Sequence, residues 1–94
     1  MSIIIKNLRR PGLLYDSTKM ATLGGMIAAS IRERTNGNYY ASSKVQQNRL
    51  IINIKGLNKH GEYVKVSKDE QIRLAARISS FLQQNNIVGD VEVK

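Results

Sequence analysis

Hydrophobic residues follow two different periods along the chain, and the period separates the predicted strands from the predicted helices. Three consecutive isoleucines favour the extended state, because β-branched side chains restrict the backbone, and they predict a strand over residues 2–6. Strict alternation places Leu50, Ile52 and Ile54 on one side of a strand over residues 49–55. These two segments are the strongest strand signals in the sequence.

The first segment with a helical repeat follows Asp16 and Ser17, either of which can cap a helix. Asn36 and Gly37 predict its end, because both residue types tolerate positive φ. Its apolar face recurs every three or four residues and consists of Met20, Leu23, Ile27 and Ile31. The spacing therefore predicts one long amphipathic helix.

A glycine pair, Gly24 and Gly25, interrupts this helix. Each glycine inside a helix costs about 1 kcal/mol relative to alanine. We expect the pair to let the helix approach a sheet closely. The alternative is a helix that begins only after the pair.

The second helix carries the clearest local signal, because Ser67 and Glu70 are spaced as a capping box. Asn85 and Asn86 favour its termination. The residues of its apolar face are Leu74, Ala75, Ile78, Phe81 and Leu82. The pattern predicts a helix packed on a core through one side.

Three shorter segments complete the predicted elements. Residues 63–66 alternate and predict a return strand that forms a hairpin with residues 49–55 across a loop at 56–61. Val91 and Val93 alternate with acidic residues and predict a final strand. Residues 38–45 combine two tyrosines with several polar residues, which fits either an edge strand or an ordered loop.

Without residues 38–45 the predicted order is βαββαβ, which is the split βαβ or ferredoxin-like order. We therefore predict an α+β fold with an antiparallel sheet and two helices on one face. Ninety-four residues suffice for one domain and are too few for two. The sequence thus indicates a single basic α+β domain over residues 1–94.

The charge balance points to a partner. Fifteen Lys and Arg residues face seven Asp and Glu residues, giving a net charge of +8. Self-repulsion of this size favours a neutralising partner, either nucleic acid or an acidic protein. No apolar stretch approaches the roughly 20 residues of a membrane-spanning helix, so no membrane partner is expected.

Cysteine is absent, which excludes disulfides and thiolate metal sites and fits a reducing compartment. The short apolar run at the N-terminus is followed by basic residues and does not resemble a signal peptide. We expect a soluble cytoplasmic protein. The only histidine, His60, falls in a predicted loop with no converging acid, base or metal ligand, so we expect no enzymatic activity, no metal and no cofactor.

Basic residues are the candidate binding residues, and they form three groups. The first group follows the first strand and comprises Lys6, Arg9 and Arg10. The second lies on the predicted outer sheet face and comprises Arg49, Lys55 and Lys65, with Tyr63 beside them. The third comprises Lys59 and His60 in the hairpin loop, with Lys44 expected nearby.

The leading hypothesis is a nucleic-acid-binding module that contacts phosphates through a basic sheet face and loops. Tyr63, joined by Tyr39 or Tyr40 if their segment pairs as a strand, could stack unpaired bases. DNA and RNA, single-stranded and double-stranded, all fit this surface.

The alternative hypothesis is a protein-interaction module, an inhibitor or assembly factor, that binds an acidic partner or self-associates as a homodimer through its sheet. Ile51 supports it, because this large apolar residue lies on the outer face. It should be covered by a second subunit, by a partner or by residues 38–45.

Overall fold

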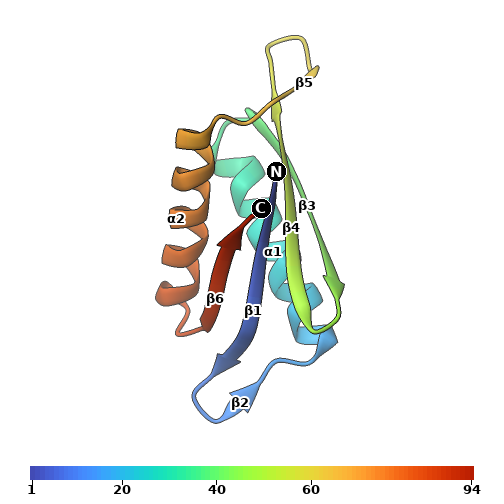
Figure 1. Ribbon diagram of the computed structural model, residues 1–94. Helices are drawn as coiled ribbons and strands as arrows, with labels where there is room; N and C mark the ends of the chain where they lie inside the picture. Colours follow the sequence, from blue (N-terminus) through green and yellow to red (C-terminus); the bar gives the residue numbers. More distant parts are fainter.

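The computed structural model describes residues 1–94 as an elongated body of 45 × 22 × 20 Å with six strands and two helices (Figure 1). The elements are β1 (Ser2–Arg10), β2 (Leu13–Leu14), α1 (Ser17–Arg34), β3 (Tyr39–Gln46), β4 (Arg49–Leu57), β5 (Tyr63–Val64), α2 (Lys68–Gln84) and β6 (Val88–Val93). The four long strands lie in the order β6-β1-β4-β3, and every neighbouring pair is antiparallel. The predicted α+β class is confirmed.

Strand β3 decides between the two interpretations of residues 38–45. It pairs with β4 from Tyr39 opposite Gly56 to Gln46 opposite Arg49, so the edge-strand interpretation is correct. A tight turn at Gln47 and Asn48 joins the two strands, with φ angles of 53° and 59°. Two consecutive positive φ angles are the mark of the type I′ turn, whose twist matches that of the flanking strands.

The predicted return strand at residues 63–66 pairs with β4 as a hairpin, but this hairpin is shorter than predicted and lies beyond residue 55. Strand β5 is limited to Tyr63 and Val64, which pair only with Leu57 and Gly56 at the end of β4. The chain then leaves the ladder because Val66 is buried in the core, at 4% exposure, immediately before α2 begins. The main partner of β4 on that edge is β1.

Strand β1 is longer than predicted because it continues through an irregularity. The ladder between β1 and β6 shifts register between Lys6 and Arg9, and Asn7 has a φ of 56°. Beyond this bulge β1 pairs with the short strand β2 across a turn that contains Gly12. The bulge returns Leu8 to the buried side of the sheet.

Helix α1 begins and ends where the sequence predicts. Asp16 is its N-cap and accepts a hydrogen bond from the backbone N–H of Lys19 at 2.8 Å. After the helix, Asn36 and Gly37 both have positive φ. The glycine pair lies inside the helix, and Gly24 makes the predicted close approach to the sheet, whereas the space around Gly25 is open.

Helix α2 has the predicted capping box. The backbone N–H of Glu70 donates to Oγ of Ser67, and the Glu70 carboxylate accepts from the backbone N–H of Ser67. The same carboxylate also accepts the hydroxyl hydrogen of Tyr39, which ties the start of α2 to β3. Asn85 caps the other end of the helix.

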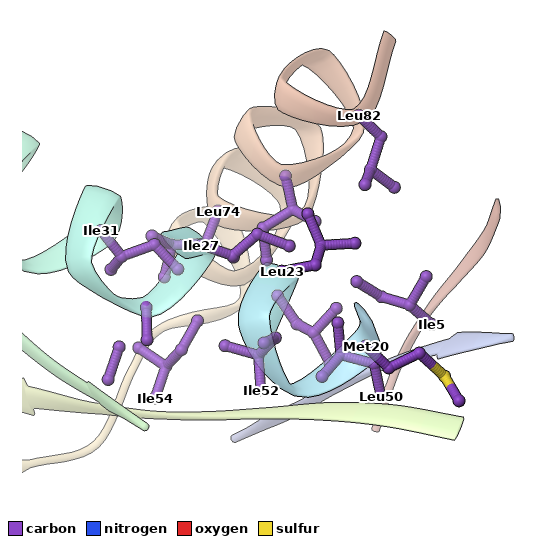
Figure 2. Packing of buried hydrophobic residues seen from close by; sticks show 14 of the residues in the cluster. Ile5, Met20, Leu23, Ile27, Ile31, Leu50, Ile52, Ile54, Leu74 and Leu82 are labelled. Atoms are coloured by element: carbon purple, nitrogen blue, oxygen red, sulfur yellow. The ribbon is translucent and has the colours of Figure 1, made fainter. Parts of the chain in front are cut away.

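Both helices pack on one side of the sheet. Figure 2 shows α1 and α2 above β4, with Leu50, Ile52 and Ile54 pointing up toward them. These residues belong to one cluster of 17 buried hydrophobic residues that takes members from β1, β4, α1 and α2. Neither helix has the length and apolar character needed to cross a membrane.

Candidate functional site

The open face of the sheet is the side that carries no helix, and the ladder sets its side chains in rows. One row runs from β6 to β3 through Glu92, Ile4, Ile51 and Lys44, which lie directly opposite one another. The neighbouring row contains Ser2, Asn53 and Ser42. These rows are the floor of the candidate site.

Ile4 and Ile51 lie in the middle of this open face, yet they are only 5% and 9% exposed. They are not part of the main core cluster, because the helices lie on the other side. They pack side by side, and the aliphatic stems of long flanking residues such as Lys44 can shield them. Of the three covers expected for Ile51, the structure shows the adjacent strand β3, whose Lys44 lies directly opposite Ile51.

Three cations stand on β3 and β4 of this face: Lys44, Arg49 and Lys55. We call them the basic strip. None of them forms an ion pair, and Arg49 donates only to the amide oxygen of Gln47 at 2.9 Å. No Asp or Glu occurs anywhere between Glu33 and Glu62, so both strands of the strip are free of carboxylates.

The opposite edge of the face carries carboxylates. Strand β6 presents Asp90 and Glu92, and Nζ of Lys6 lies 3.2 Å from the Glu92 carboxylate. The side-chain amide of Asn7 donates to Asp90 at 2.8 Å. Lys6 was expected to follow the first strand, but it lies within β1 on the open face, where the Glu92 carboxylate pairs with it.

Two tyrosines meet at one end of the basic strip. The ring centroids of Tyr40 and Tyr63 are 6.4 Å apart, and the ring planes are inclined by 47°. Nζ of Lys55 lies 4.6 Å from the centre of the Tyr63 ring, within cation–π range. Of the two tyrosines in its segment, Tyr40 joins the open face, whereas Tyr39 packs against the core and bonds to Glu70.

Arg9 and Arg10 lie apart from the basic strip, at the far end of β1 beyond the bulge. A guanidinium N–H of Arg9 donates to the backbone oxygen of Asn7. Arg10 lines a hollow of about 240 Å³ on the helix side, together with Tyr15 and Phe81. Arg10 therefore lies on the helix side, and no strand pairing links Arg9 to β3 or β4.

The loop between β4 and β5 carries Lys59 and His60 beyond the end of the sheet (Figure 1). The Asn58 carboxamide oxygen organises this loop by accepting the backbone N–H groups of His60 and Glu62. The expectation that Lys44 lies nearby is wrong. Lys44 pairs with Ile51, and Leu57 at the end of β4 is six positions further along the strand, or about 20 Å.

Lys65 was predicted to lie on a strand, but it follows the last residue of β5. It nevertheless lines a hollow of about 520 Å³ with Lys55, Tyr63 and Lys94. A second hollow, of about 310 Å³, lies on the other side of Lys55 and is lined in part by Tyr40, Ser42 and Asn53. Lys55 is thus central to the end of the face.

Ser42 and Asn53 are site residues that the sequence analysis missed. Both are small and polar, and neither carries a charge or a ring that would mark it as a binding residue. The available signal is the period of β4, which places Asn53 between Ile51 and Lys55 on the outer side. Ser42 can be placed only after β3 has been paired with β4.

The open face therefore combines unpaired cations, exposed aromatic rings and small polar groups. Cations attract phosphates, and rings with adjacent amides and hydroxyls can contact bases. No group of three His, Cys, Asp or Glu side chains is close enough together to hold a metal ion. No protein-family model, curated protein or solved structure matches this chain.

Proposed function

We propose that this protein is a small nucleic-acid-binding module that holds the phosphate backbone of its ligand against the open face of the sheet. The observation that carries the proposal is the basic strip, whose three cations have no carboxylate partner. A lysine or arginine that neutralises a phosphate releases the counterions condensed there, and this release drives binding. A cation already paired with a carboxylate contributes less, so a cluster of unpaired cations favours binding.

The spacing of the strip supports contact with several phosphates. Arg49 and Lys55 are six residues apart on one strand, or about 20 Å, and Lys44 lies between them on the adjacent strand. A nucleic-acid backbone along β3 and β4 would pass all three cations. The β6 edge adds less attraction for this backbone, because its cation Lys6 is already paired with Glu92.

We also propose that the fold is the split βαβ, or ferredoxin-like, arrangement. The order β6-β1-β4-β3 with antiparallel neighbours and both helices on one side supports this assignment. The four strands of that arrangement would be β1, β3, β4 and β6, with β2 and β5 as short additions. An arrangement of this kind leaves one whole sheet face available for a ligand.

The proposal is tested by fluorescence anisotropy with labelled DNA and RNA, single-stranded and double-stranded, at several salt concentrations. We expect binding that weakens steeply with salt. The triple variant Lys44→Ala, Arg49→Ala, Lys55→Ala should bind roughly tenfold or more weakly at low salt, and its salt slope should be shallower by about 2 to 3.

A matched control removes three exposed arginines from the helix layer, as Arg34→Ala, Arg73→Ala and Arg77→Ala. It lowers the net charge by the same amount but leaves the open face intact, so it should retain most of the affinity. Equal losses in the two triple variants would contradict a localised site. No binding at low salt would overturn the proposal and redirect the search to an acidic protein partner.

A further inference from the structure

The tyrosine pair at the end of the basic strip is unusually accessible. Tyr40 is 43% exposed and Tyr63 is 61% exposed, and both stand on the side of the sheet that no helix covers. The chain contains only five aromatic residues, namely four Tyr and one Phe. Two of the five are thus presented to solvent next to an unpaired cation, where they add little to the core.

The hollow beside Tyr40 offers polar groups at the same place. It has a volume of about 310 Å³, and Ser42, Asn53 and Lys55 contribute to its lining. The Asn53 carboxamide oxygen accepts the hydroxyl hydrogen of Ser2 at 2.8 Å, which fixes the amide. The amide N–H groups of Asn53 and the hydroxyl of Ser42 have no protein acceptor, so they can bond to a ligand.

Exposed aromatic rings can stack only on an unpaired base. In a duplex the faces of the bases are already stacked on one another, so a tyrosine ring on a flat sheet cannot reach them. A single strand can turn its bases toward the protein, stack them on tyrosine rings and leave its phosphates to the cations beside them. The close contact of Lys55 with Tyr63 puts both kinds of recognition at one point.

We infer that the ligand of the open face is a single-stranded nucleic acid, with one or more unpaired bases stacked on Tyr40 and Tyr63 and an edge of one base against Asn53 and Ser42. This inference rests on the proposed function, which supplies the phosphate contacts. It adds that the ligand is single-stranded, and it assigns Tyr40 and Tyr63 as the residues that select a single strand over a duplex.

The experiment compares three probes of equal length by anisotropy: a single strand, the corresponding duplex and an abasic single strand that keeps the phosphates but lacks the bases. We expect the single strand to bind roughly tenfold or more tightly than the abasic strand. The double variant Tyr40→Ala, Tyr63→Ala should reduce single-strand affinity to the abasic level and leave the salt slope unchanged. The double variant Tyr40→Phe, Tyr63→Phe keeps both rings and should retain the preference.

The outcomes separate this inference from the proposed function. If the abasic and normal strands bind equally, or if the alanine variant binds as tightly as the natural chain, base stacking is refuted while phosphate binding stands. If the duplex binds more tightly than the single strand, the strand assignment is wrong. If none of the probes binds at low salt, the proposed function itself fails.

Discussion

Gly24 of α1 lies against Leu50 of β4, so closely that a Cβ atom on the glycine would be 2.7 Å from Cδ1 of Leu50. It would also be 2.8 Å from Cβ of Ser43 on β3. Leu50 is fully buried and the Ser43 Cβ is fixed to the backbone, so neither atom can move away freely. The helix therefore sits at a depth that only glycine permits.

The glycine pair provides a matched test of this close approach. We expect Gly24→Ala to lower the free energy of unfolding by about 1–2 kcal/mol, because overpacking outweighs the gain in helix propensity. We expect Gly25→Ala to raise it by about 1 kcal/mol, because no atom lies within 4 Å of the added methyl group. Urea unfolding of both variants gives the two values, and changes of the same sign would contradict the packing described for α1.

The capping box of α2 should contribute measurably to stability. Ser67→Ala removes the acceptor for the backbone N–H of Glu70 and should lower the free energy of unfolding by about 1 kcal/mol. Ser80→Ala is the control, because Ser80 is exposed on the same helix and alanine is the better helix former there. A loss of stability in the control as large as that in Ser67→Ala would show that the effect does not come from the cap.

Asp16 should make the stability of the protein depend on pH in acid. The backbone N–H and then the side chain of Lys19 donate to its carboxylate and lower its pKa below the ordinary value of 3.8. Because the folded-state pKa is lowered, the contribution is complete above pH 3.8 and is lost as the pH falls through the folded-state pKa. Asp16→Asn keeps a capping oxygen but cannot titrate. Over roughly pH 5 to pH 2, the free energy of unfolding of this variant should therefore fall less than that of the natural chain. Denaturant melts of both chains at several pH values give the comparison, and parallel pH profiles would rule out this role.

The Lys6–Glu92 ion pair should limit binding more than it supports folding. Both side chains are more than two-fifths exposed, so Glu92→Gln should change the free energy of unfolding by less than about 1 kcal/mol. If the open face binds phosphates, the released Lys6 should increase the affinity and steepen the salt slope by about 0.7 to 0.9. Glu33→Gln on α1 makes the same change in net charge away from the face. An equal gain in the two variants would mean that only net charge matters.

The helices were predictable because local residues specify them. The caps at Asp16 and Ser67 and the apolar spacing along each helix act within a few residues, so the sequence contains the whole signal. The alternation in β4 is equally local. These elements alone establish the α+β class.

The sequence of β3 fits a loop as well as a strand, and the close approach of Gly24 is one reason. Two positions on the helix side of β3 carry small side chains: Ala41 is fully buried, and Ser43 meets Gly24. Small inward residues remove the hydrophobic contrast on which a period-two pattern depends. The weak strand signal is therefore a consequence of the packing.

The candidate site was predictable only in part. The long stretch without carboxylates between Glu33 and Glu62 is visible in the sequence, and it contains the whole basic strip. The neutralisation of Lys6 by Glu92 is not visible, because it depends on the pairing of β1 with the last strand of the chain. The meeting of Tyr40 and Tyr63 likewise depends on two strands that flank β4 on opposite edges.

The turn at Gln47 and Asn48 has an influence far beyond its size. Even-numbered positions of β4 from Leu50 to Ile54 face the helices, and the odd-numbered positions lie on the open face. If the hairpin slipped by one residue, the two sets would exchange places, and Arg49 and Lys55 would point into the protein interior. Two residues with positive φ thus keep the cations of this strand out of the hydrophobic core. A turn longer by one residue would exchange the two faces of the strand.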